Sequence, residues 1–300
     1  MKSRLIVNPV SGTDAASSHL SLINDRLREH VGTMDIVMTI AEGDAARAAA
    51  AAVRDGYDHL FVAGGDGTLN EAVNGVGATP GGFETVTFAV IPLGTGNDFA
   101  TSLGIPSDVE GALAAIIGGQ TLAVDVGRLN ERYFLNVSAG GFIAEVSDAV
   151  DPTLKTLAGR LAYLIGGAQV LFSHEPVDAR VRTSRGRDTH ATLTIFAVCN
   201  SRLIGGGRLI APEASIDDGL FDVCLIEEMP TVEFLGLLTR IANGDHVGDD
   251  RVTYFRTPDV DLTFARPTKV NTDGEVLEAT SCRYELLPAA LRIIAPVRER

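Results

Sequence analysis

The stretch GGDGTLNEAVNG, residues 64–75, follows the short apolar segment His59–Ala63 and decides how the N-terminal part of the chain folds. The apolar segment has the length of a buried strand and Thr68–Asn74 has a helical pattern, so the glycines occupy a turn from a strand into a helix. In open parallel sheets, ligands bind at the carboxyl ends of strands, where glycines let backbone N–H groups approach an anion near a helix N-terminus. The turn is therefore predicted to contact a phosphate group through Gly64, Gly65 and Gly67.

Asp66 is the unusual residue of this turn, because a carboxylate among phosphates is unfavourable. It becomes favourable if a cation bridges the carboxylate and the phosphates, or if Asp66 accepts a proton during a reaction. The turn lacks the lysine of a P-loop, and Asn70 stands where the dinucleotide motif G-x-G-x-x-G has its last glycine. A tight turn in which Asp66 caps the helix is the alternative.

Two further polar turns follow predicted strands. Pro92–Asp98 comes after the apolar segment Val86–Ile91, and Asn8–Gly12 comes after Arg4–Val7. The later turn either contacts phosphate or forms a loop whose N-cap is Asn97 or Asp98. Three such turns at consecutive strand ends predict one shared nucleotide site, to which the later turn contributes Gly94, Thr95, Asn97 and Asp98.

The periodicity of the whole chain predicts two domains. Strands and helices alternate in residues 1–125, which indicates a doubly wound, Rossmann-like α/β domain with a parallel sheet. After a shift in composition, short alternating strands predict a mostly antiparallel, β-rich domain over residues 126–287, with helices near Thr153–Phe172 and Val232–Asn243. The segment 288–300 could complete the first domain. The strands expected in the second domain are Tyr133–Val137, Asp178–Thr183, Thr192–Val198, Leu220–Ile226, Val252–Phe255, Val260–Phe264 and Ser281–Leu286.

Composition and charge exclude several classes of protein. The chain has 300 residues, a formal net charge of −14, no tryptophan and 6% aromatic residues, which argues against nucleic-acid binding. Its cysteines, Cys199, Cys224 and Cys282, show no C-x-x-C spacing, which is typical of a reduced, cytoplasmic protein. The most apolar helical stretch, Leu161–Phe172, is too short to span a bilayer, so any membrane contact is expected to be peripheral.

Taken together, GGDGTLNEAVNG and PLGTGNDFA (Pro92–Ala100) resemble the soluble bacterial diacylglycerol kinases, which are relatives of the sphingosine kinases. NPVSG near the N-terminus, the Thr39…Asp44-Ala45 pair, DDGLFDV (Asp217–Val223) and NTDGE (Asn271–Glu275) stand in the order of that family. GGDGT alone is shared with NAD kinases and phosphofructokinases, whereas NAD kinases lack the second motif. The resemblance covers essentially the whole chain.

The resemblance implies the NAD kinase/diacylglycerol kinase-like fold and an ATP- and Mg²⁺-dependent lipid kinase. Its substrate is expected to be diacylglycerol or a related lipid with a primary hydroxyl. It also implies a structural Mg²⁺ held by Asp218 and the backbone carbonyls of Ser215 and Leu220, and it puts Asp273 at the catalytic centre. The nucleotide contacts that it implies are Asn8, Pro9, Ser11, Gly12, Thr39, Gly65, Asp66, Gly67, Thr68, Asn70, Glu71 and Thr95.

The residue types of the C-terminal motifs suggest roles for them without the resemblance. Asp273-Gly274 is a hairpin-turn signal, and Asp273 and Glu275 could share a metal ion or a proton at its tip; a solvated hairpin is the alternative. We expect Asp66 and Asp273 to cooperate, one near Mg²⁺–ATP and one near the substrate hydroxyl, and either could be the base. Asp217-Asp218-Gly219 offers half of an oxygen-ligand site for Mg²⁺, or a plain turn before a strand.

Two segments suit contact with a membrane. Apolar residues recur at helical spacing from Leu157 to Leu171, which is typical either of core packing or of a membrane-surface helix. A cluster of four arginines surrounds a predicted turn and forms either a solvated hairpin or a docking patch for anionic lipid. Its members are Arg180, Arg182, Arg185 and Arg187.

Several alternatives stay open at this point. The acceptor lipid is not readable from the residues, and paired strands in the second domain could support a homodimer. A NAD kinase-like transferase that acts on a soluble acceptor is a second enzyme class. A non-catalytic nucleotide or lipid sensor is a third interpretation.

Overall fold

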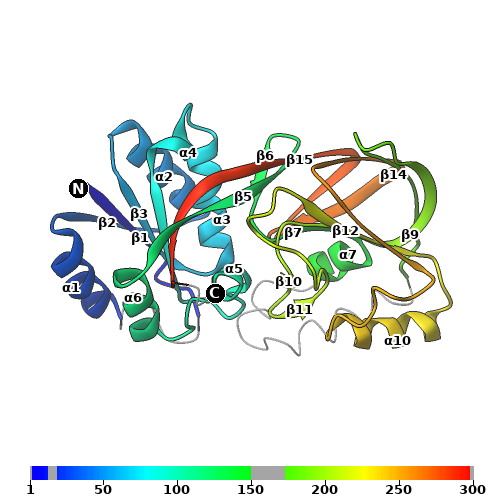
Figure 1. The fold of residues 1–300 in the computed structure, drawn as a ribbon, viewed down its shortest axis with the longest axis horizontal. Helices are drawn as coiled ribbons and strands as arrows, with labels where there is room; N and C mark the ends of the chain where they lie inside the picture. The colour runs from blue at the N-terminus through cyan, green and yellow to red at the C-terminus, as the bar shows by residue number, and fades with distance from the viewer. Residues whose placement is uncertain (1, 13–18, 150–172, 298–300) are drawn as a thin grey trace. The chain divides into compact units, whose positions relative to one another are not determined.

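The chain forms two compact units (Figure 1). The computed structural model describes residues 2–12, 19–149 and 173–297. Unit 1 comprises Met1–Val126 with Pro288–Arg300, and unit 2 comprises Gly127–Leu287. The helix predicted near Thr153–Phe172 lies outside the described residues. Within those residues, no helix is both long enough and apolar enough to cross a bilayer.

Unit 1 is an α/β unit built on a parallel sheet with the strand order β15–β4–β3–β1–β2. Leu5 on β1 lies between Ile36 on β2 and Phe61 on β3, in a continuous register. This arrangement confirms the predicted fold class of the N-terminal part. The elements are β1 (Ser3–Val7), α1 (Leu20–Val31), β2 (Met34–Met38), α2 (Asp44–Arg54), β3 (His59–Gly64), α3 (Asp66–Gly77), α4 (Gly82–Thr85), β4 (Thr87–Pro92), α5 (Asp98–Leu103), α6 (Val109–Ile117) and the C-terminal part of β15 (Glu275–Ala295).

Helices cover both faces of this sheet, because side chains alternate between the two faces of each strand. On one face, α1 and α6 pack on the strands in a core that includes Leu5, Ile23, Leu27, Phe61 and Leu113. On the other face, α2 contacts β1 and α3 contacts β3. Helices α2 and α3 approach closely because Gly75 has no side chain: a Cβ atom there would lie 2.1 Å from the carbonyl oxygen of Ala46.

Unit 2 is built from antiparallel strands, as predicted for the C-terminal part. β9 pairs with β7, β8 and β12, and β14 pairs with β7, β8 and β15. Residues of β8 alternate between buried and exposed along its whole length, as expected of a strand with one face on a core. The elements that lie wholly or partly in unit 2 are β5 (Gln120–Leu129), β6 (Arg132–Phe134), β7 (Val137–Gly141), α7 (Phe142–Ala149), β8 (Val177–Arg182), β9 (Asp188–Cys199), β10 (Leu203–Ile204), β11 (Arg208–Leu209), β12 (Phe221–Glu227), α10 (Thr231–Ile241), β13 (Val252–Thr257), β14 (Asp259–Thr272) and β15 (Glu275–Ala295).

Two apolar clusters stabilise unit 2. The first lies between the strands, where Phe134 stacks on Phe221 with ring centroids 5.7 Å apart. The second packs α7 and α10 against strands, and Phe142 meets Phe234 edge to face at 5.0 Å. Aromatic pairs of this kind add about 0.5–1.5 kcal/mol to the apolar burial of their rings.

The strand predicted at Tyr133–Val137 is wrong in its extent. The structure has two strands there, β6 and β7, separated by Leu135 and Asn136. The backbone N–H groups of these two residues donate to the carboxylate of Asp273, which lies 138 and 137 residues away in the chain. A local pattern carries no information about so distant an acceptor.

Candidate functional site

The three glycine-rich turns predicted to form one site lie together in unit 1. A Cβ atom on Gly94 would lie 2.7 Å from the Cα atom of Gly65, so the middle and later turns touch through their backbones. Gly12 approaches the later turn in the same way, since a Cβ atom there would lie 2.2 Å from the carbonyl oxygen of Leu93. Its φ of 81° also favours glycine. The backbones of the three turns therefore pack directly on one another.

Asp66 ties the middle turn to the start of α5. Its carboxylate accepts hydrogen bonds from the backbone N–H groups of Asp98, at 3.0 Å, and Phe99, at 3.2 Å. N–H groups in the first turn of a helix lack acceptors inside the helix, and Asp66 satisfies two of them. Asp66 thus caps α5. The alternative interpretation named another helix, that of Asp66's own turn, but Asp66 is the first residue of that helix, α3, and the N-cap there is Gly65.

Asn97 shapes the later turn from within. Its Oδ1 accepts from the N–H of Gly94 at 3.0 Å, and its Nδ2 donates to the carbonyl oxygen of Gly94 at 2.6 Å. The φ of Asn97 is 53°, a left-handed conformation that asparagine tolerates better than most residues. Both side-chain polar atoms of Asn97 therefore hold the later turn in its conformation.

Asn8 links the first turn to the middle one. Its Nδ2 donates to Thr68 Oγ1 at 3.0 Å, and its Oδ1 accepts from the N–H of Val10 at 3.2 Å. Thr39 joins the same region, because its N–H donates to the carbonyl oxygen of Val7 at 2.8 Å. The predicted contacts from β1, β2 and α3 are thus neighbours in unit 1.

The loop after β2 is held by two carboxylates. Asp44 accepts from the backbone N–H groups of Ile40 and Ala41, both at 2.8 Å, and these donors hold its pKa below the usual value. Glu71 on α3 accepts from the N–H of Ala45 at 3.3 Å. Both acidic residues therefore fix the backbone beside the turns.

Unit 2 contains the second predicted centre, at the hairpin that joins β14 to β15. Asp273 and Gly274 form its turn with φ values of 48° and 98°, as the Asp-Gly signal predicts. The carboxylate of Asp273 accepts hydrogen bonds from three consecutive backbone N–H groups, those of Leu135 at 2.6 Å, Asn136 at 3.1 Å and Val137 at 3.0 Å. Such donors stabilise the ionised form of a carboxylate. The hairpin is therefore anchored rather than simply solvated.

Glu275 has a different partner from Asp273. Its carboxylate forms an ion pair with Arg132. The sharing of one metal ion or one proton by the two carboxylates stays a prediction. Over the described part of the chain, no three His, Cys, Asp or Glu side chains gather in a way that could hold a metal ion.

Asp218, the predicted magnesium ligand, forms an ion pair with Arg256. Its Oδ1 accepts from the N–H of Leu220 at 3.0 Å. A carboxylate with two backbone carbonyls, here those of Ser215 and Leu220, is a donor set that Mg²⁺ accepts. A guanidinium group already supplies the positive charge beside Asp218, so these residues fit a metal ion only if Arg256 moves aside.

The sequence patterns gave no role to Arg256, and Asp222 stood in the DDGLFDV motif without a role of its own. Asp222 is fully buried; its Oδ2 lies 3.5 Å from Arg256 Nε, and its Oδ1 accepts from the hydroxyl of Tyr254 at 2.7 Å. Burial raises the pKa of Asp222 to about 6. Arg256 therefore bridges a partly exposed carboxylate, that of Asp218, and a buried one. The visible sign in the sequence was an aspartate inside the apolar strand β12.

The chain is similar to known proteins along its whole length. Residues 2–129 match the family described as diacylglycerol kinase catalytic domain, and residues 136–295 match the YegS C-terminal NAD kinase beta sandwich-like domain. The diacylglycerol kinase of Bacillus subtilis (strain 168) is 33% identical over 91% of this chain and 89% of its own length. The diacylglycerol kinase of Staphylococcus aureus (strain bovine RF122 / ET3-1) is 32% identical over 98% of this chain and 92% of its own length. A crystal structure of a putative diacylglycerol kinase from Bacillus anthracis str. Sterne superposes with a TM-score of 0.83, at 25% identity over 98% of this chain and 96% of that one.

Proposed function

The chain belongs to the diacylglycerol kinase family, as its motifs predicted, and from that premise we propose that it transfers the γ-phosphoryl group of ATP to the primary hydroxyl of diacylglycerol or a related lipid. With diacylglycerol, the product is phosphatidic acid. One observation supports this proposal: Asp66 and the glycines of three turns lie together at the carboxyl ends of parallel strands. Such a site suits a polyphosphate, because helix N-termini and closely approaching backbone N–H groups favour anions.

In unit 1, the proposed role of the turns is to bind ATP and to hold its phosphates in a defined orientation. Asp66 keeps the α5 turn in place through its two N–H contacts. Bound Mg²⁺ would supply charge neutralisation for the phosphates. The proposed nucleotide contacts are Asn8, Pro9, Ser11, Gly12, Thr39, Gly64, Gly65, Asp66, Gly67, Thr68, Asn70, Glu71, Gly94, Thr95, Asn97 and Asp98.

In unit 2, Asp273 is the proposed acceptor of the hydroxyl proton. The lipid oxygen would bond to the γ-phosphorus as the bond from that phosphorus to ADP breaks, and its proton would pass to the carboxylate. The N–H groups of Leu135–Val137 support this role because they fix the direction of the carboxylate. Glu275, paired with Arg132, is proposed to hold the hairpin in place.

A structural Mg²⁺ at Asp218 belongs to the proposal with one condition. Since Arg256 forms an ion pair with that carboxylate, the metal ion and the guanidinium would compete for it. The carbonyls of Ser215 and Leu220 would complete the oxygen ligands.

The proposed place of action is the cytoplasm, with peripheral contact to a membrane. A diacylglycerol acceptor lies in a bilayer, and the described helices include none that could cross one. Assembly as a homodimer through strands of unit 2 is part of the same proposal.

The test is phosphoryl transfer from labelled ATP with Mg²⁺ and mixed micelles, each containing one candidate lipid, beside an NAD control. We expect transfer to diacylglycerol that is lost in Asp273→Asn and kept in Asp25→Asn, which alters an exposed carboxylate on α1. Transfer only to another lipid would keep the chemistry and change the substrate. Phosphorylation of NAD without any transfer to lipid would contradict the proposal.

A NAD kinase-like transferase is the second candidate, because residues 136–295 match a domain described as NAD kinase beta sandwich-like. The NAD control separates this candidate from a lipid kinase. A protein that binds ATP and lipid but transfers no phosphate in either arm would be a sensor.

A further inference from the structure

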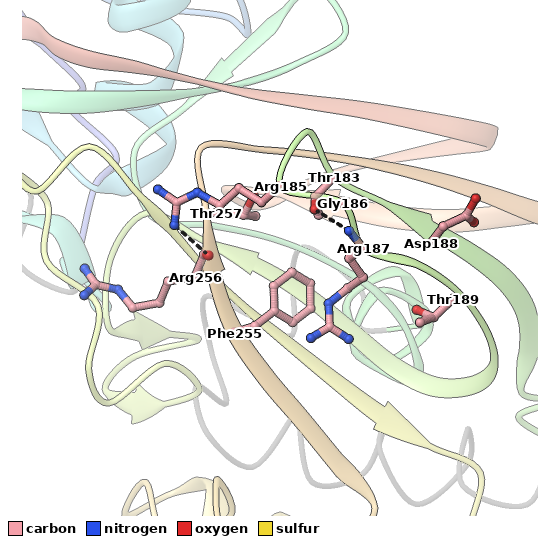
Figure 2. Close-up of a pocket in the computed structure, with 9 residues that line it drawn as sticks. All are labelled: Thr183, Arg185, Gly186, Arg187, Asp188, Thr189, Phe255, Arg256 and Thr257. Atoms are coloured by element: carbon pink, nitrogen blue, oxygen red, sulfur yellow. Dashed lines mark hydrogen bonds between the residues drawn. The ribbon is translucent and has the colours of Figure 1, made fainter.

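Unit 2 has a surface hollow of about 510 Å³ apart from the turns and hairpin discussed above. It lies between the turn of the β8–β9 hairpin and the end of β13, and its lining includes Arg185, Arg187, Phe255 and Arg256 (Figure 2). Pockets that hold small molecules usually enclose about 300–1,000 Å³. The hollow is therefore large enough for a phosphate-bearing group.

Positive charge is concentrated at this hollow, although the whole chain carries a formal charge of −14. Three of the described residues that line it are arginines, and Asp188 is the single acidic one. The two carboxylate oxygens of Asp188 accept from Nε and Nη2 of Arg180, at 2.8 and 2.7 Å. Asp188 is thus neutralised by an arginine from outside the lining.

Arg185 and Arg187 carry the positive charge of the hollow that no carboxylate neutralises. In the part of the chain that the structure describes, neither has a carboxylate oxygen within 4.0 Å. Arg256 differs, because it is paired with Asp218 and Asp222. Any anion attracted to the hollow would therefore bind chiefly to the first two arginines.

Both side chains are held in place without losing their charge. The guanidinium of Arg187 lies over the ring of Phe255, 4.1 Å from its centroid, a contact that does not consume N–H donors. Nη1 of Arg185 donates to the carbonyl oxygen of Arg256 at 3.3 Å, which uses one of its five donors (Figure 2). Gly186 lies between them with a φ of 92°, so the turn is tight.

One further carboxylate, that of Asp259, contacts the turn. It accepts from the N–H of Ser184 at 2.8 Å and from the Ser184 hydroxyl. Its two oxygens therefore anchor the turn to β14 rather than neutralise an arginine. Stacking and anchoring together distinguish this turn from a freely solvated hairpin.

We propose that the hollow is an anion site that binds a phosphate group through Arg185 and Arg187. The planar fork of each guanidinium matches two phosphate oxygens. This chemistry has two sources, the headgroup of an anionic phospholipid and a soluble phosphate. The site is independent of the proposed reaction, because neither arginine has a role in phosphoryl transfer.

The test compares Arg185→Gln/Arg187→Gln with the matched variant Arg182→Gln/Arg283→Gln. The control removes the same charge from two exposed arginines that do not line the hollow. Calorimetry measures binding of inorganic phosphate, and co-sedimentation measures binding to phosphatidylcholine vesicles with and without phosphatidylglycerol. We expect the hollow variant to bind one of these ligands about tenfold more weakly than the control, and the difference to shrink at high salt.

The outcome also assigns the source of the phosphate. Weaker binding of inorganic phosphate indicates a soluble ligand, whereas weaker phosphatidylglycerol-dependent sedimentation indicates a lipid headgroup. Equal binding of both ligands by the two double variants would overturn the proposal. If thermal unfolding shows that the hollow variant folds poorly, Arg185→Gln against Arg182→Gln repeats the comparison with the Phe255 stacking intact.

Discussion

Replacement of Gly94 by alanine should push apart the two turns that meet in unit 1. The new Cβ atom would lie 2.7 Å from the Cα atom of Gly65 and 2.8 Å from Oδ1 of Asn97. Ordinary contact would require a shift of about 0.7 Å or more. Asn97 cannot move aside cheaply, since its side chain bonds to both the N–H and the carbonyl oxygen of residue 94.

The loss of stability in Gly94→Ala follows from these contacts. Overpacking against backbone atoms destabilises proteins by about 1–3 kcal/mol. At about 2–4 °C for each kcal/mol, the melting temperature of Gly94→Ala should fall by roughly 2–12 °C. Separation of the turns should also weaken ATP binding, because the proposed phosphate site is built from both turns.

Gly67→Ala is the matched control, because it makes the same chemical change in the turn that Gly94 touches. A Cβ atom at Gly67 would meet nothing within 4 Å. Alanine also favours helix over glycine by up to about 1 kcal/mol, so the melting temperature should stay level or rise slightly. Scanning calorimetry measures both variants, and ATP titration follows. Equal melting temperatures in the two variants would refute the close-contact argument, whereas weaker ATP binding by a stable Gly67→Ala would support phosphate at that turn.

Three further predictions concern unit 2. Asp273→Asn should lower kcat by about 10²–10⁴-fold without changing ATP affinity if the carboxylate accepts the hydroxyl proton, and an unchanged kcat would contradict this role. Arg256→Gln should free Asp218 for a cation, so its melting temperature should rise more with added Mg²⁺ than that of the unmodified protein; an equal response would argue against competition. Burial raises the pKa of Asp222 to about 6, so protonation of this carboxyl stabilises the folded state. This contribution to the free energy of unfolding is complete below pH ~4 and is lost as the pH rises through about 6. The free energy of unfolding should fall by at most about 3 kcal/mol over this pH range, and Asp222→Asn should abolish that fall. The same pH dependence in the variant and the unmodified protein would contradict the role of Asp222.

Local sequence was sufficient for the fold class. The apolar runs that became β1, β3 and β4, and the helical patterns that became α3 and α10, all appear close to their predicted bounds. Hydrophobic periodicity belongs to neighbouring residues, so it can be read without a structure. The same holds for the Asp273-Gly274 turn, whose residues adopt the conformations that the dipeptide favours. The family was also readable, because its motifs are short and contiguous.

Strand extents depended on partners elsewhere in the chain. β14 and β15 continue well beyond the predicted Val260–Phe264 and Ser281–Leu286, because residues 268–272 of β14 pair with residues 275–279 of β15 after a register shift, and the end of β15 pairs with β4. β6 and β7 separate where the carboxylate of Asp273 takes up the backbone N–H groups. A hydrogen-bond partner across a sheet leaves no trace in the local pattern.

The sequence by itself determined which residues are candidates for the chemistry: Asp66, Asp218 and Asp273 stand in polar, glycine-bearing turns after predicted strands or before one, inside contiguous family motifs. Only the tertiary structure decided what each carboxylate contacts. Asp66 meets the start of α5, Asp218 meets Arg256, and Asp273 meets the backbone between β6 and β7. The physical reason is that a carboxylate takes whatever donors the packing of distant elements brings within hydrogen-bonding range, and that packing depends on the whole chain.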